Sequence, residues 1–130
     1  MSNSDFKYTR TRSGIHIDEY VGFDTYVPVP EEIEGLPVTS IGYRAFDNEN
    51  LYKVIIPASI QTIVYAAFVS KQSMHVLFKG ESIQLTPQSF IAPKITFYFY
   101  NAIIYDSIYP ITKNNPKYVI HYDAMDFRMV

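Results

Sequence analysis

Residues 39–68, TSIGYRAFDNENLYKVIIPASIQTIVYAAF, decide how this chain folds. Ile41 and Ile63 are 22 residues apart, and Phe46 and Phe68 are separated by the same interval. A period of this length is typical of proteins whose repeats stack into a solenoid. The same interval links Ile63 to Leu85, Phe68 to Phe90, Val54 to Val76, and Ile56 to Phe78.

The central repeat predicts a short strand followed by a sharp turn. Leu51-x-x-Val54-x-Ile56 has the leucine-rich spacing L-x-x-L-x-L, which directs alternate strand residues into a core. Pro57 has no amide hydrogen to continue a ladder, so we expect the strand to end there.

The Ala-Phe pairs at 45–46 and 67–68 are expected on short helical or 3-10 turns, where the small alanine allows close packing. The phenylalanines then fill the interior of each coil. We predict that Phe46, Phe68 and Phe90 form one internal column, in which burial of each ring contributes about 1.5–3 kcal/mol.

The flanking segments are interpreted as caps and modified repeats of one domain. Residues 5–20 alternate apolar and polar side chains around Ser13-Gly14, which predicts a β-hairpin. Residues 34–38 interrupt the first repeat and are expected to form a protruding loop. The last strand is predicted at 118–122, after the turn at 113–116. The predicted organisation is an N-terminal cap at 1–25, repeats at 26–100 and a C-terminal cap at 101–130.

The strand at 95–100, ITFYFY, leaves its register open. The exact period directs Tyr98 and Tyr100 inward, whereas the preference for apolar burial favours Phe97 and Phe99. We choose the phenylalanines, and Tyr98 is then expected to point outward.

Composition indicates a globular chain without a strong electrostatic preference. The 130 residues are 48% apolar and 18% charged, with a net charge of −2 and no cysteine. These values exclude a disulfide framework and a thiolate metal site, and they argue against nucleic-acid binding. The first residues lack a signal-peptide pattern, and no run approaches the roughly 18 apolar residues of a membrane span. We expect a cytoplasmic chain, or a secreted or surface one if preceding sequence directs export.

The repeat resembles that of the BspA-type leucine-rich proteins over about residues 15–100. The shared string is Ile-Gly-x-x-Ala-Phe followed by Leu-x-x-Ile-x-Ile-Pro-x-Ser-Val, matched here from Ile41 through Ile60. The segment from Ile33 to Gly42 is also similar to the first repeat of that family. The resemblance implies an α/β, right-handed superhelix with a short parallel sheet along one side. Members are often surface proteins that bind host proteins or other cells, which implies an adhesion role.

The outer face of the predicted sheet is the candidate binding site. If alternate strand residues point inward, the remaining ones form an apolar ladder, which on a soluble protein often marks a contact surface. Two alternatives remain open: the C-terminal segment folds over this face, or the face merely carries single, scattered apolar residues. The candidate partner-binding residues are Pro28, Ile55, Leu77 and Tyr98, rimmed by Lys53, Lys79 and Thr96.

No motif in the sequence predicts catalysis, a cofactor or a metal site. The three histidines, His16, His75 and His121, have no partner at ligand spacing and are interpreted as ordinary surface residues. A Ser/His/Asp site assembled across the fold stays formally open, although no nucleophile elbow or phosphate loop is present.

Three functions are therefore considered. The first is a non-enzymatic module that binds a protein through the sheet face. The second is an assembly unit that self-associates through a sheet edge or the tyrosine-rich C-terminal coil, whose tyrosines are equally consistent with half-buried strand positions. An enzyme is the third and least supported.

Overall fold

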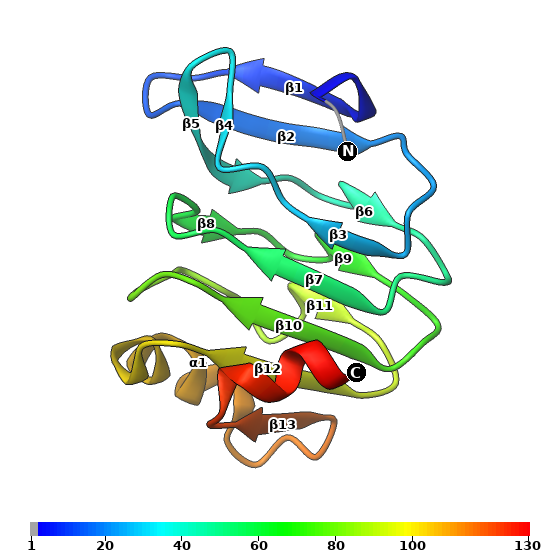
Figure 1. The fold of residues 1–130 in the computed structure, drawn as a ribbon, viewed down its shortest axis with the longest axis vertical. Helices are drawn as coiled ribbons and strands as arrows, with labels where there is room; N and C mark the ends of the chain where they lie inside the picture. The colour runs from blue at the N-terminus through cyan, green and yellow to red at the C-terminus, as the bar shows by residue number, and fades with distance from the viewer. Residues whose placement is uncertain (1–2) are drawn as a thin grey trace.

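The computed structural model describes residues 3–130 and shows a mixed α/β protein made mostly of short strands, with few short helices (Figure 1). The elements in chain order are η1 (Asn3–Asp5), β1 (Phe6–Arg10), β2 (Ile15–Tyr20), β3 (Tyr26–Pro28), β4 (Glu32–Ile33), β5 (Leu36–Ile41), β6 (Phe46–Asp47), β7 (Lys53–Ile56), β8 (Thr62–Ile63), β9 (Phe68–Val69), β10 (Met74–Phe78), β11 (Phe90–Ile91), β12 (Ile95–Phe99), η2 (Ala102–Ile104), α1 (Tyr105–Thr112), β13 (Tyr118–His121) and η3 (Ala124–Met129), where η denotes a 3-10 helix.

Three sheets share one hydrophobic core. The central sheet has the order β13-β12-β10-β7-β3, and all of its neighbouring strands are parallel. A second sheet contains β1, β2, β5 and β4, with β8 paired to β5, and a third has the order β11-β9-β6. Val54 lies opposite Val76, and Ile56 lies opposite Phe78. The strand pairs predicted from the 22-residue interval are therefore confirmed.

The predicted column of phenylalanines is also confirmed. Phe46, Phe68 and Phe90 begin the two-residue strands β6, β9 and β11 and pair in register. Their ring centroids are 4.8 and 4.9 Å apart, the rings are nearly parallel, and all three side chains are buried. Phe78 and Phe97 from the central sheet approach Phe90 edge to face, which links the column to that sheet.

The turns that precede these phenylalanines differ from the helical or 3-10 turns expected. Arg44 and Ala66 have φ values of 52° and 55°, in the left-handed region that helices do not use. Their amides donate across the stack instead of along the chain: Arg44 N–H bonds the carbonyl of Ala66, and Ala66 N–H bonds that of Gln88. The next amides along the chain still bond locally, Ala45 to the carbonyl of Gly42 and Ala67 to that of Val64, so each turn is closed by one local bond and also bonded to the following segment.

The N-terminal hairpin is present as predicted, and it lies at one end of the molecule (Figure 1). Its residues Phe6 and Tyr20 pack against Phe46, with ring centroids 6.1 and 5.5 Å away. The loop expected at residues 34–38 is instead part of a second antiparallel hairpin between β4 and β5. Glu34 and Gly35 both have positive φ, as a tight type I′ turn requires, so the inserted residues pair rather than protrude as a loop.

The register chosen for β12 is confirmed. Phe97 and Phe99 belong to the main core, and Phe97 pairs with Val76. The departure from the exact period arises because Phe90 to Ile95 is one residue shorter than Phe68 to Met74. A strand slip of one residue exchanges the two faces.

The C-terminal quarter contains the predicted strand β13, which pairs with β12, and the helices η2 and α1, which were not predicted. Ile104, Ile108 and Ile111 are the buried residues of this helical segment, at the i, i+4, i+7 spacing of one helix face. That spacing is a signal in the sequence that could have identified the helix.

Candidate functional site

The outer face of the central sheet carries two straight rows of side chains, because parallel strands in register place equivalent residues side by side. The rows cross β3, β7, β10, β12 and β13 in that spatial order. One row is Tyr26, Lys53, His75, Thr96 and Val119, and the other is Pro28, Ile55, Leu77, Tyr98 and His121.

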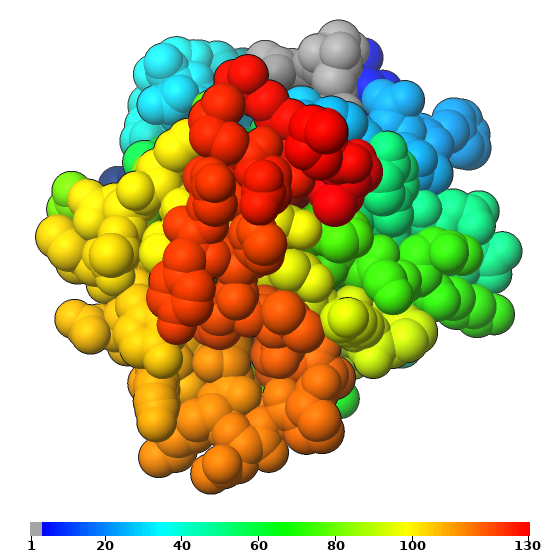
Figure 2. All heavy atoms as spheres, turned by 60° about the horizontal axis from the view of Figure 1, so that its bottom comes forward, coloured from blue at the N-terminus to red at the C-terminus, as the bar shows by residue number. Residues whose placement is uncertain are grey.

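The 3-10 helix η3 lies across the middle of this face. The centroid of the Phe127 ring is 5.4 Å from that of Tyr98 and 6.2 Å from that of Tyr26, both edge to face. Phe127 and Ala124 form a hydrophobic cluster with Leu77 and Tyr98 that is separate from the main core. In Figure 2 the C-terminal residues, coloured red, run as a ridge over the surface.

The local sequence explains why η3 forms and which side it buries. Asp123 is extended, and its side chain accepts a hydrogen bond at 2.9 Å from the amide of Met125, which starts the helix. Ala124 and Phe127 are three residues apart, so in a 3-10 helix they align on the same side. They are the two buried residues of this helix.

Lys53 lies against the ring of Phe127, the aromatic residue that η3 buries. Its ammonium is 4.5 Å from the centroid of the Phe127 ring and 4.7 Å from that of Tyr26, and it donates to the main-chain oxygen of Val130 at 3.3 Å. An ammonium between two ring faces is attracted by about 0.5–2 kcal/mol, more as water is excluded. Two rings and one main-chain oxygen therefore compensate its burial.

Two histidines flank Tyr98 on the same face. The Nδ1 atom of His75 is 2.8 Å from the Tyr98 hydroxyl, and the Nε2 atom of His121 is 2.6 Å from a carboxylate oxygen of Asp126 in η3. Burial lowers the pKa of His75, and the positive charges of Lys53 and a second lysine lower it further. Burial, together with the negative charge of Asp126, raises the pKa of the Tyr98 hydroxyl.

The structure corrects the prediction that the outer ladder is exposed. Leu77 and Tyr98 are both 3% exposed, and Lys53 is 5% exposed. Ile55 is half-buried, whereas Pro28 and Lys79 are exposed as expected. The side chains of Ile55, Leu77 and Tyr98 do point away from the main core, but Ala124 and Phe127 pack over them.

Sequence reasoning did not assign the other residues of this face: Tyr26, His75, Val119 and His121 on the sheet, and Ala124, Asp126 and Phe127 above it. The sequence leaves open that the C-terminal segment covers the face but does not indicate which of its residues make the contact. The available signal was Asp123, a capping residue, followed by two apolar residues three positions apart.

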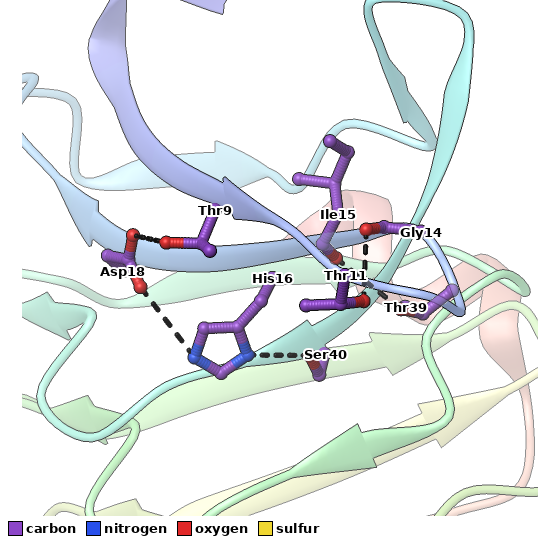
Figure 3. Close-up of polar contacts among 8 residues, drawn as sticks. All are labelled: Thr9, Thr11, Gly14, Ile15, His16, Asp18, Thr39 and Ser40. Carbon is purple, nitrogen blue, oxygen red and sulfur yellow. Dashed lines mark hydrogen bonds and ion pairs between the residues drawn. The ribbon is translucent and has the colours of Figure 1, made fainter.

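A second polar arrangement lies on β2 and β5 and is shown in Figure 3. The Nδ1 atom of His16 is 2.6 Å from the Ser40 hydroxyl, and its Nε2 atom is 3.8 Å from a carboxylate oxygen of Asp18. Thr9 on β1 donates to the other carboxylate oxygen of Asp18 at 2.7 Å. This brings together the three residue types of a nucleophilic triad.

The geometry of this arrangement is that of contacts across a sheet surface. At 3.8 Å Asp18 is within ion-pair distance of His16 but beyond the hydrogen-bond distance with which a triad carboxylate orients its histidine. Ser40 lies within β5 and is paired with β2 on one side and β8 on the other, so its strand backbone is engaged in pairing rather than placed around a reacting group. The cluster ties β1, β2 and β5 together.

A hollow of about 560 Å³ lies beside β8. Some of its polar lining is paired within the protein: the Ser107 hydroxyl accepts from the amide of Ile83 at 3.0 Å, and the Thr62 hydroxyl donates to the side chain of Gln84 at 3.4 Å. Among residues 3–130, no three or more acidic or histidine side chains gather as metal ligands. No helix in the described part of the chain is long and apolar enough to cross a bilayer.

Comparisons with protein-family models, with curated proteins and with solved structures find no match to this chain.

Proposed function

We propose that this protein is a non-enzymatic recognition module, built as a short right-handed leucine-rich-repeat solenoid of the BspA type, that binds a protein through the outer face of the central sheet. Two features support the repeat interpretation. Residues 22 positions apart are strand neighbours in both the central sheet and the sheet that carries the phenylalanine column. The Ala-Phe pair at 45–46 recurs at 67–68, and Val54 and Ile56 of the leucine-rich motif recur as Val76 and Phe78 at the same interval.

The observation that carries the binding proposal is that this face already holds an apolar helical segment. Leu77 and Tyr98 bury Phe127 in a cluster separate from the main core. A face that packs a phenylalanine from one segment has the shape and chemistry to pack one from another. Because hydrogen-bonded parallel strands fix its side chains in advance, binding requires little ordering of the receptor.

Site-specific photo-cross-linking tests this proposal without disturbing the covered residues. A photoreactive amino acid is placed at Pro28 or Lys79, which are exposed at the margin of the face, and at Arg12, which is exposed on the N-terminal hairpin. We expect one discrete cross-linked protein in extracts of the source cells from the first two positions and none from the third. Absence of cross-links at positions 28 and 79, or the same products at position 12, would contradict the proposal.

Self-association is the second candidate function, and one observation favours it. Three exposed tyrosines, Tyr100, Tyr109 and Tyr122, belong to the C-terminal part of the chain, which also supplies the edge strand β13. Exposed tyrosines are good interface residues because they provide a large contact area at low entropic cost. Light scattering over a range of concentrations separates the two functions, since a recognition monomer stays near 15.0 kDa and an assembly unit does not.

A further inference from the structure

We infer that the outer sheet face is a receptor for a short helical peptide segment of another protein, in which a small residue is followed by an acidic residue and then by phenylalanine. Residues 123–130 of this chain imitate that segment and compete with it. This inference rests on the proposed function and adds the chemistry of the partner and the means of its regulation.

The seat for the phenylalanine is specific for an aromatic ring. Tyr26 and Tyr98 meet the edge or face of Phe127 from two strands, and Leu77 packs beside it. The ammonium of Lys53 lies 4.5 Å from the centroid of the ring. An aliphatic side chain would fill the same volume but would remove one of the two ring faces that compensate this buried charge.

The same lysine requires a second group from the occupant. Lys53 donates to the main-chain oxygen of Val130, three residues after Phe127. A segment that supplied the ring without this acceptor would leave the ammonium with only its two aromatic neighbours. The receptor therefore contacts a ring and, three residues later, a main-chain oxygen just after the helix.

The receptor face also contacts residues that precede the phenylalanine. The small Ala124 is buried in the cluster with Leu77 and Tyr98, and a carboxylate oxygen of Asp126 lies 2.6 Å from the Nε2 atom of His121. Met125, in contrast, is 54% exposed and is not one of the buried residues of this cluster. The recognised pattern is thus small-x-acid-Phe, with the second position free.

The internal segment is well suited to being displaced. It follows β13 directly, and Ala124 and Phe127 are the two residues that η3 buries. Undocking it exposes these two side chains and their seat but leaves the main core intact, because that core is a separate cluster. A competing segment lowers the apparent affinity of an external one by the fraction of time that the face is occupied.

Binding of a synthetic peptide to the full chain tests the inference. The probe is a fluorescent peptide of residues 123–130, DAMDFRMV, followed by fluorescence anisotropy. Phe127→Asp in the protein should undock the internal segment and tighten peptide binding at least tenfold relative to the unchanged chain. Met129→Asp is the matched control, because Met129 is 83% exposed on the same helix, and it should bind the peptide no better than the unchanged chain.

Changes in the peptide and in the receptor test the pattern itself. A peptide carrying Phe127→Ala should bind the Phe127→Asp protein at least tenfold more weakly, whereas one carrying Arg128→Ala should bind equally well because Arg128 is exposed. Adding Ile55→Glu to the Phe127→Asp protein should abolish binding. Circular dichroism verifies folding, and Phe127→Ala in the protein serves as a milder substitute if the aspartate variant does not fold.

Three results would overturn the inference. The first is a folded Phe127→Asp protein that binds the peptide no better than the unchanged chain. The second is equal binding of the Phe127→Ala peptide. The third is a full chain that is dimeric in light scattering and becomes monomeric with Phe127→Asp, which would assign the face to a second copy. Cross-links at positions 28 and 79 without peptide binding would leave the recognition function standing and reject only this partner chemistry.

Discussion

Removing the Phe68 ring should be among the most destabilising single changes in this protein. Phe68 is 0% exposed and stacks between Phe46 and Phe90, with centroid distances of 4.8 and 4.9 Å. Phe68→Ala opens a cavity that the parallel strands on either side cannot close. Substitutions of this kind cost about 3–5 kcal/mol, and we expect the upper half of that range because two ring contacts are lost together.

The size of this effect is large compared with the total stability of a domain, which is typically about 5–15 kcal/mol. A loss of 3–5 kcal/mol corresponds to a decrease in Tm of roughly 10–20 °C for a chain of this length. Urea denaturation followed by far-ultraviolet circular dichroism measures it directly, and the m value should stay unchanged because the native fold persists.

Phe23→Ala is the matched control, because the Phe23 side chain is 94% exposed and its loss should change stability by less than about 0.5 kcal/mol. The comparison removes any effect of replacing phenylalanine as such. If Phe68→Ala costs less than about 1 kcal/mol, or no more than Phe23→Ala, the stacked column does not organise the core and the packing described above is wrong.

Three further predictions follow from particular contacts. Phe127→Ala should increase proteolysis and amide exchange in residues 123–130 while lowering global stability by no more than about 3 kcal/mol, because the loss cannot exceed the docking free energy of η3; Met129→Ala should leave both measurements unchanged. Burial first, and then nearby lysines, lower the pKa of His75 below 6.5, so its contribution to stability is complete above pH 6.5 and is lost as the pH falls below that value. Thermal denaturation between pH 8 and 5 should therefore show a steeper acid loss for the unchanged chain than for His75→Gln, and equal slopes would refute this. Gly14→Ala should lower the free energy of unfolding, measured by urea denaturation, more than Gly35→Ala does. A methyl group at Gly14 would lie 2.3 Å from a backbone carbonyl oxygen, whereas one at Gly35 would meet nothing within 4 Å. Gly35→Ala should therefore cost only the strain of the left-handed backbone, about 1–2 kcal/mol.

Much of the stacking of successive strands could be predicted because the sequence repeats with a fixed interval of 22 residues. Ile41 and Ile63, like Phe46 and Phe68, occupy equivalent places in successive turns, and the structure pairs both sets in register. The spacing predicts which residues are neighbours, but it does not predict the backbone conformation of the turns that bring them together. The left-handed φ values of Arg44 and Ala66 belong to non-glycine residues, which give no signal for that conformation in the sequence.

The candidate site was predicted less well, for a different physical reason. The outward direction of Ile55, Leu77 and Tyr98 follows from strand alternation, which is a local property. Their burial depends on where residues 124–127 pack after β13. This is a tertiary contact, and no repeat in the sequence indicates it. Two apolar residues three positions apart suffice to make a helix amphipathic, but they do not specify the surface that it covers.

The 22-residue register also constrains how a gene for this protein can change in length. In the sheet of β6, β9 and β11, the central strand β9 pairs with β6 on one side and with β11 on the other. Duplication of 22 consecutive residues between Phe46 and Phe90 would give every new side chain a neighbour of the kind its original has, and loss of 22 would leave two stacked rings in place of three. Insertions of other lengths must be absorbed between strands, as in the shortened turn before β12, so whole units should be gained and lost more readily than single residues.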